Sequence, residues 1–185
     1  MLKERVIMAY ELSKTAHAGQ KRKCTDLDYF THPKAVARII EKLEGSEDLI
    51  IASLLHDTVE DTDVTIEYIE NMFGGYVASL VNEVTNKPSD KDKFQNNKLH
   101  MHWKFRQLSQ EAFLLKLADR FHNVLFLERD ASHSEEGISF IKYYRDQTQY
   151  VMKDLMSDIG FMPSIRQTTL YTQICLVIDF LELMY

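Results

Sequence analysis

The sequence predicts an all-α fold, and two features of its composition carry that prediction. The 185 residues include only 6 Gly and 3 Pro, roughly 5% where average usage would give about 12%. So few turn formers disfavour a many-stranded sheet, which needs many tight turns. Apolar residues recur at helical spacing, and a hydrophobic content of 45% can fill a core at this length. We therefore expect roughly nine helices in a single domain over residues 1–185.

The expected helices begin and end at residues that favour helix ends. Gly19 follows a first amphipathic helix that begins near Val6, and Pro33 suits the first turn of a second helix. Ser46 can cap a third helix over about 47–59, whose apolar residues on most sides predict a central, buried position. The later helices are expected near 66–73, 76–85, 98–103, 112–127, 138–159 and 164–184, with polar loops at 88–97 and 128–137.

Charge and cysteine content narrow the class of protein. The net charge of −6 disfavours nucleic-acid binding, which needs a basic face. Two cysteines, Cys24 and Cys175, do not make a disulfide framework and indicate free thiols in the cytoplasm. No apolar run reaches the ~18 residues of a membrane span, and the charged residues from Lys3 to Arg5 do not resemble a signal peptide. We expect a small-molecule partner, without nucleic acid or membrane.

A cluster of polar residues lies at the C-terminal end of the expected third helix. His56, Asp57, Glu60 and Asp61 fall within two turns and, at 100° per residue, on one continuous face. Burying an ionised carboxylate costs several kcal/mol unless it is paired or bound to metal. One interpretation is a divalent metal site. The other is a helix end that reaches solvent, and the segment alone leaves both open.

Two further segments offer matching ligands. Asp119 follows an apolar helical run, and His122 and Asn123 share its face. His32 begins the Pro33 helix, although a lone histidine there is more typical of a cap or a surface residue. The set His32, His56, Asp57 and Asp119 suits Mn²⁺, Fe²⁺ or Zn²⁺ and leaves coordination positions open. Such a metal activates bound water and polarises a phosphoryl oxygen, while Glu60 and Asp61 remain available for proton transfer.

These residues form the H…HD…D pattern of the HD-domain phosphohydrolases, and longer strings narrow the resemblance. The sequence is similar to the hydrolase domain of the RelA/SpoT alarmone enzymes in HAGQKRK (17–23), YFTHPKAVARII (29–40), ASLLHDTVEDTDVT (52–65), FGGYVASLVNEVT (73–85) and LLKLADRFHNV (114–124). The strings keep the family's order over about residues 1–127. The remaining length can complete that domain but not a synthetase domain, so the chain resembles the stand-alone small alarmone hydrolases of metazoan type.

The resemblance implies an HD-domain helical fold and Mn²⁺-dependent removal of the 3′-pyrophosphate from (p)ppGpp. It implies that His32, His56, Asp57 and Asp119 bind the metal and that Glu60 and Asp61 act in proton transfer. The family's substrate contacts correspond to Arg22, Lys23, Asn123 and Tyr143. Two alternatives remain open: NADPH phosphatase or another nucleotide phosphohydrolase at the same metal, and a non-catalytic nucleotide sensor.

The chain departs from the family pattern in two places beside the expected nucleotide pocket. The loop at 24–28 contains neither the Gly nor the Pro that relatives usually have after the basic pair. After Asn123 the chain reads Val124-Leu125-Phe126, where many members have an arginine. Both departures affect the expected nucleotide contacts and leave the four expected metal ligands in place.

Overall fold

A computed structural model describes residues 4–23, 25–87, 97–131, 134–157 and 169–185, and it confirms the predicted all-α fold. Over this part of the chain there are nine helices of eight residues or more, and the one β-bridge joins Lys21 to Asp28. The helices are α1 (Glu4–Ala16), α2 (Thr31–Lys42), α3 (Glu47–Leu55), α5 (Ile66–Phe73), α6 (Gly75–Val84), α8 (Asn97–Gln107), α9 (Gln110–Ala131), α10 (Glu135–Ser157) and α12 (Thr169–Met184), with a single further turn, α4 (Thr58–Asp61).

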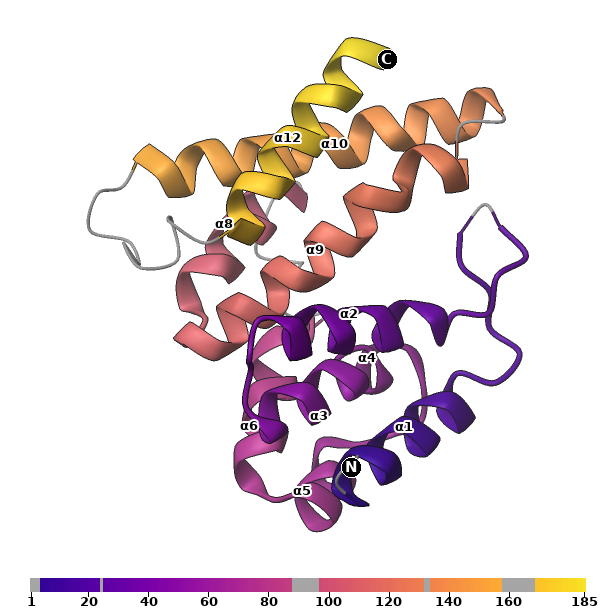
Figure 1. Cartoon of the computed structure of the whole chain (residues 1–185), viewed down its shortest axis with the longest axis vertical. Helices are drawn as coiled ribbons and strands as arrows, with labels where there is room; N and C mark the ends of the chain where they lie inside the picture. The colour runs from indigo at the N-terminus through magenta and orange to yellow at the C-terminus, as the bar shows by residue number, and fades with distance from the viewer. Residues whose placement is uncertain (1–3, 24, 88–96, 132–133, 158–168) are drawn as a thin grey trace.

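The long helix α9 joins two groups of helices. In Figure 1, α1 to α6 lie on one side of it, and α10 and α12 lie on the other. α9 packs against α2, α3 and α6 in the first group and against α10 and α12 in the second. Side chains on one helix therefore reach both groups, which places α9 at the centre of any site formed between them.

The third helix is central, as predicted, but it ends earlier than predicted. α3 contacts α1, α2, α6 and α9, and Leu49 and Leu55 are among its buried side chains. The expected helix over 47–59 breaks after Leu55, because two side chains bond its last backbone carbonyls. His56 Nδ1 lies 2.9 Å from the Ser53 carbonyl, and the Thr58 hydroxyl donates to the Leu55 carbonyl at 2.7 Å. Such local bonds compete with the helical pattern and set His56 and Asp57 in a turn.

The connection between α9 and α10 is shorter than the predicted loop at 128–137. α9 continues to Ala131 and α10 begins at Glu135. Ala131 and Leu127 are buried with Ile141 and Leu181 in a small second core, which extends α9 beyond its predicted end. Gly137 permits this close turn, because a Cβ at that position would overlap the backbone carbonyl of Ala131. The predicted loop at 88–97 lies outside the described residues except for Asn97, which begins α8.

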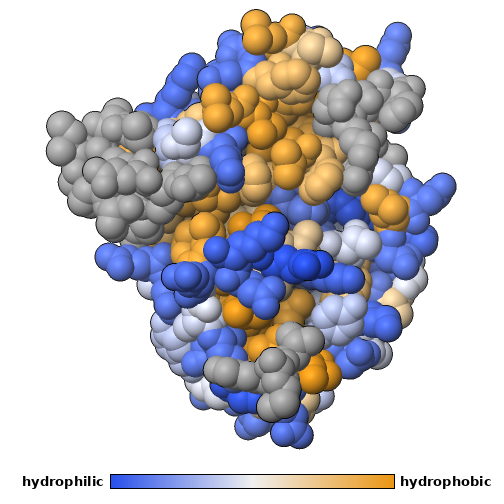
Figure 2. Space-filling view, in the orientation of Figure 1, coloured by the Kyte–Doolittle hydropathy of each residue, from blue (hydrophilic) through white to orange (hydrophobic). Residues whose placement is uncertain are grey.

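The last helix carries an apolar outer surface. Leu176, Phe180, Leu183 and Met184 are exposed on α12, and the corresponding region is orange in Figure 2. The inner side of α12 contributes Ile174 and Ile178 to the main core. Among the helices in the described ranges, none has the length and apolar character needed to cross a membrane.

Candidate active site

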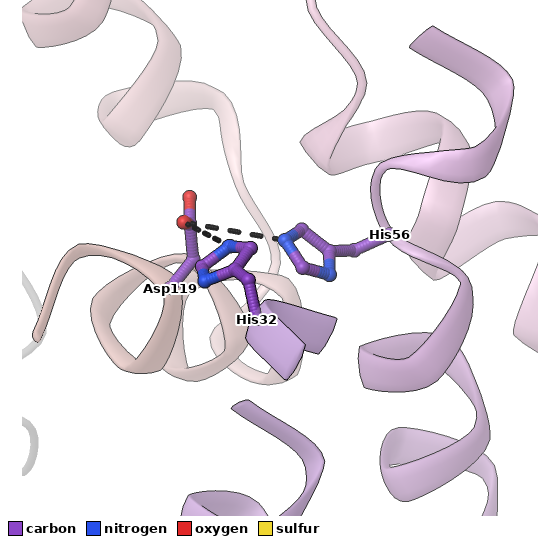
Figure 3. Close-up of side chains that lie close together, drawn as sticks. All are labelled: His32, His56 and Asp119. Atoms are coloured by element: carbon purple, nitrogen blue, oxygen red, sulfur yellow. Dashed lines mark ion pairs between the residues drawn. The ribbon is translucent and has the colours of Figure 1, made fainter. Parts of the chain in front are cut away.

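Three of the four predicted metal ligands converge from three helical elements. His32 lies in the first turn of α2, His56 follows α3, and Asp119 lies midway along α9. Figure 3 shows the three side chains pointing toward one another. One ligand atom from each lies within 4.8 Å of the others, and all three residues are buried. Segments far apart in the sequence thus bring two imidazoles and a carboxylate to one point.

The fourth predicted ligand, Asp57, joins this cluster. Its Oδ2 lies 3.1 Å from His56 Nε2 and 3.6 Å from His32 Nε2, and His32 Nε2 lies 3.2 Å from Asp119 Oδ1. Metal–ligand bonds of about 2.0–2.2 Å place neighbouring ligand atoms roughly 3 Å apart. The observed separations therefore fit four groups that share one divalent ion.

The imidazole of His56 provides an independent test of that fit. Its Nδ1 donates to the Ser53 carbonyl, so the neutral form of the ring has its lone pair at Nε2. This Nε2 atom is buried and has no hydrogen-bond partner. A buried nitrogen lone pair without a partner is costly, and a metal ion at the centre of the cluster would satisfy it. A hydrogen bond at Nδ1 that directs Nε2 toward the metal is the usual arrangement of metal-binding histidines.

The charges around the cluster favour a cation. Burial lowers the pKa of His32. Burial also acts to lower the pKa of His56, but the charges of Asp57 and Asp119 outweigh it and raise that pKa to about 9. Burial disfavours the Asp57 carboxylate, yet the neighbouring His56 holds its pKa well below the usual range. The carboxylates therefore stay ionised and attract positive charge.

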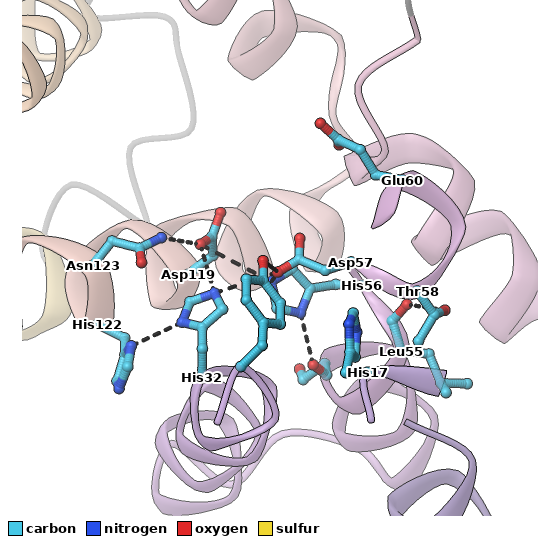
Figure 4. A network of polar contacts seen from close by, with 12 residues as sticks. His17, His32, Leu55, His56, Asp57, Thr58, Glu60, Asp119, His122 and Asn123 are labelled. Carbon is cyan, nitrogen blue, oxygen red and sulfur yellow. Dashed lines mark hydrogen bonds and ion pairs between the residues drawn. The ribbon is translucent and has the colours of Figure 1, made fainter. Parts of the chain in front are cut away.

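Asp119 is held in place from two sides. Lys116, one turn earlier on α9, places its Nζ 2.9 Å from Asp119 Oδ2. Asn123, one turn later, donates to Asp119 Oδ1 at 2.6 Å, a contact drawn in Figure 4. Burial disfavours the charged carboxylate, but Lys116 and His32 hold the pKa of Asp119 well below its usual range. The i, i+3 spacing of Lys116 and Asp119 could have identified this pair from sequence.

The two residues predicted for proton transfer lie at the edge of the cluster. Glu60 is exposed, and its carboxylate accepts from the backbone and side-chain amides of Asn86 at 2.9 and 3.0 Å. Figure 4 shows it displaced from the buried ligands. Asp61 reaches solvent, but partial burial and the charge of Asp57 raise the pKa of its carboxyl.

One contact of the ligand cluster was not identified from the sequence patterns. The Tyr29 hydroxyl donates to the Asp57 carboxylate at 2.7 Å.

A hollow beside the cluster brings together three of the four predicted substrate contacts. Arg22, Lys23 and Asn123 line it with aromatic and aliphatic side chains that include Phe140 and Tyr144. Arg22 lies 3.4 Å from the Asn123 side-chain oxygen, and the Lys23 ammonium lies 3.8 Å from the centre of the Phe140 ring. We call this space the aromatic pocket. Its tyrosine on α10 is Tyr144, whereas the predicted Tyr143 is exposed and contacts Asn97.

The loop that carries the basic pair closes without Gly or Pro. The Arg22 amide donates to the Leu27 carbonyl at 2.9 Å, and the Thr25 amide donates to the Arg22 carbonyl at 3.2 Å. The Thr25 hydroxyl accepts from the Leu27 amide at 3.1 Å. Hydrogen bonds of the Thr25 side chain and backbone therefore supply this turn without either residue, and they hold Arg22 at the aromatic pocket.

Comparison with known proteins decides the family. The HD domain family matches residues 9–139. This chain belongs to the HD-domain family. The HD-domain chain is 39% identical over 127 residues to a relative from Xenopus tropicalis named guanosine-3′,5′-bis(diphosphate) 3′-pyrophosphohydrolase MESH1, a match that covers 67% of this chain and 70% of the relative. The resemblance to the SpoT-type proteins is confirmed.

Bacterial relatives of this HD-domain chain are much longer. It is 41% identical over 137 residues to a probable guanosine-3′,5′-bis(diphosphate) 3′-pyrophosphohydrolase of Synechocystis, covering 71% of this chain and 17% of the relative. It is 38% identical over 127 residues to the bifunctional (p)ppGpp synthase/hydrolase SpoT of Escherichia coli, covering 65% of this chain and 18% of the relative. The chain thus spans less than a fifth of the length of these two proteins.

Solved structures confirm the fold of the HD-domain chain. A metazoan orthologue of SpoT, described as hydrolysing ppGpp, aligns with a TM-score of 0.79 at 24% identity and covers 97% of both chains. The protein lmo0812 of Listeria monocytogenes aligns with a TM-score of 0.65 at 25% identity, covering 85% of this chain and 99% of its own. The predicted HD-domain fold is therefore confirmed.

Proposed function

We propose that this HD-domain chain hydrolyses guanosine-3′,5′-bis(diphosphate) and its 5′-triphosphate analogue, taking up water and releasing pyrophosphate with GDP or GTP. One observation carries the proposal. Asn123 joins the ligand cluster to the aromatic pocket, because it donates to Asp119 and its side-chain oxygen lies 3.4 Å from Arg22. A nucleotide in the pocket therefore has its phosphates beside the cluster. The names of the relatives support the same substrate.

We propose Mn²⁺ as the metal, held by His32, His56, Asp57 and Asp119. Two imidazoles and two carboxylates suit this ion. When bound, such a metal lowers the pKa of water and offsets charge on a phosphoryl group. The protein contributes the fixed orientation of the two imidazoles and the buried carboxylates, which need no rearrangement to receive the ion.

The remaining residues act on different parts of the substrate. Arg22 and Lys23 offset phosphate charge, and the Phe140 and Tyr144 rings offer apolar surface to the purine. Glu60 and Asp61, at the solvent-facing edge, exchange protons with water and the leaving group. The raised pKa of Asp61 suits this role, because a carboxyl whose pKa lies closer to the working pH transfers protons more readily.

With only two cysteines in the chain, we place this activity in the cytoplasm.

Parallel assays test the substrate. Purified protein with Mn²⁺ is incubated with ppGpp, pppGpp, pppApp and NADPH, and the products are separated by ion-exchange chromatography. Release of pyrophosphate from ppGpp or pppGpp is expected. Turnover of NADPH with none of ppGpp would instead show a phosphatase at the same metal. If an unrelated nucleotide is the substrate, the proposal is wrong.

Substitution of Asp57 separates catalysis from nucleotide sensing. Asp57→Ala removes one predicted ligand and should abolish turnover. The matched control is Asp63→Ala, since Asp63 is an exposed carboxylate shortly after α4 and makes no contact with the cluster among the described residues. A cellular effect that survives Asp57→Ala without turnover would favour a non-catalytic sensor.

A further inference from the structure

A second, strongly basic hollow lies along α9 next to the ligand cluster. Lys116 and Arg120 of α9 line it together with Lys104 of α8, Gln147 of α10 and Asn86. Its volume is about 600 Å³, counting space open to solvent. The described residues that line it include three cationic side chains and no carboxylate. We call this space the cationic pocket.

The cationic side chains are buried, which is costly for charged groups. Lys104 is 7% exposed, Lys116 8% and Arg120 8%. Lys116 pairs with Asp119, and Lys104 donates to the Thr85 carbonyl at 2.8 Å. Arg120 has weaker partners. Its guanidinium stacks 4.3 Å from the centre of the Tyr144 ring, and one of its terminal nitrogens donates to Met101 Sδ at 2.9 Å.

Two residues of this pocket have buried donor atoms that lack hydrogen bonds. Within the described part of the chain, Arg120 Nε and Nη1 have no acceptor, and neither does the buried Gln147 Nε2. The great majority of buried hydrogen-bond donors in proteins have an acceptor. A structural arginine would have a carboxylate or carbonyl acceptor, whereas this guanidinium has a thioether, which is a weak acceptor. Phosphate oxygens, with their negative charge and several lone pairs, would satisfy these donors.

The cationic pocket is connected to the candidate active site from both ends. Lys116 lines it and contacts Asp119, a predicted metal ligand. Asn86 lines it and donates to Glu60, a residue proposed for proton transfer. Arg120 separates it from the aromatic pocket, because the guanidinium lines the cationic pocket and the Tyr144 ring beneath it lines the aromatic pocket. The two pockets therefore lie on either side of one cation–π pair.

We propose that the cationic pocket binds the diphosphate group that hydrolysis releases, with Arg120 as its principal donor. This inference rests on the proposed function in one respect, namely that the diphosphate is the 3′-group of the nucleotide held in the aromatic pocket. The guanidinium exchanges Met101 Sδ for phosphate oxygens, and Gln147 supplies a further donor. A diphosphate fits better than a monophosphate, because it can reach donors on α9 and α10 together.

The test measures binding of inorganic pyrophosphate without requiring turnover. Pyrophosphate and, separately, orthophosphate are titrated by calorimetry into the metal-loaded protein, at the same metal concentration for each variant. The variants are Arg120→Met, Arg120→Lys and Gln147→Leu, and the matched control is Lys153→Met, which removes an exposed cation from α10. Metal content is measured for each by elemental analysis, so that loss of the ion is not mistaken for loss of the pocket.

The expected result is a pyrophosphate Kd at least tenfold higher for Arg120→Met, a smaller increase for Arg120→Lys and Gln147→Leu, and a change below twofold for Lys153→Met. Orthophosphate should bind at least tenfold more weakly than pyrophosphate to the wild type. If Arg120→Met does not fold, the other two variants decide the question. A wild type that does not bind pyrophosphate, or folded variants that all bind it within twofold of wild type, would overturn the proposal. Failure of the wild type to hydrolyse ppGpp would instead refute the proposed function.

Discussion

The Nδ1 atoms of His32 and His122 lie 2.8 Å apart in the buried space between α2 and α9. One of the two must carry the proton that joins them. If His32 binds a metal through Nε2, its proton is on Nδ1 and His122 is the acceptor. With a metal bound at His32 Nε2, His122 would fix the tautomer and ring orientation of this predicted ligand without belonging to the ligand set.

Replacing this acceptor should weaken metal binding. His122→Phe leaves the Nδ1 proton of His32 without its partner, and loss of such an outer contact typically lowers metal affinity about 10–100-fold. Calorimetric titration of the metal-free protein with Mn²⁺ gives the affinity. His102→Phe is the control, because His102 contacts Asp154 away from the cluster. Equal affinities for both variants would remove His122 from the metal site.

Removal of the metal should lower the thermal stability of the protein. Without the ion, buried His56 Nε2 has no partner and the Asp57 and Asp119 carboxylates lose their shared cation. A ligand at a hundred times its Kd stabilises the folded state by about 2.7 kcal/mol. Scanning calorimetry before and after chelation, and again after Mn²⁺ is restored, measures the change. An unchanged melting temperature would show that these residues hold no ion.

The two carboxylates at the edge should affect the rate and not metal binding. Glu60→Gln combined with Asp61→Asn keeps the size of both side chains and removes their capacity to transfer protons. We expect kcat for ppGpp to fall by about 10²–10⁴-fold while the metal content stays at one ion per chain. Near-normal kcat in the double variant would show that other groups move the proton.

Arg22 should contribute mainly to substrate binding. Arg22→Met removes a cation from the aromatic pocket, and one hydrogen bond to a charged group is worth about 1.5–3 kcal/mol. We expect KM for ppGpp to rise by at least tenfold with a small change in kcat. Lys21→Met is the matched control, because Lys21 lies in the same hairpin but pairs with Asp28 at its exposed edge. Comparable KM values for the two variants would place the substrate elsewhere.

Gly137 should be required for the close turn between α9 and α10. Gly137→Ala forces a Cβ against the Ala131 carbonyl, and overpacking of this kind typically costs about 1–3 kcal/mol. Gly75→Ala is the control, since a Cβ there meets only the Glu70 carboxylate at an ordinary 3.5 Å. Urea denaturation gives both free energies of unfolding. A stability of Gly137→Ala equal to wild type would show that the turn relaxes without cost.

Much of the fold was predictable because its signals are local. The scarcity of Gly and Pro and the helical spacing of apolar residues predicted an all-α chain, and Ser46 does cap α3 by accepting from the Leu49 amide at 3.2 Å. The end of α3 was not predictable in the same way. It depends on the side chains of His56 and Thr58 bonding backbone carbonyls, a competition that spacing alone does not settle.

By itself, the sequence determined the fold class and the family and predicted a ligand set, because these depend on residue types at fixed spacing along the chain. Tertiary structure decided the geometry that gives the motif its meaning. Only the packing of α9 between two groups of helices brings Asp119 to His32 and His56 and sets Tyr144, not Tyr143, in the aromatic pocket. The cationic pocket around Arg120 likewise arises from α8, α9 and α10 together. Contacts between distant segments depend on packing over the whole chain, which no local pattern encodes.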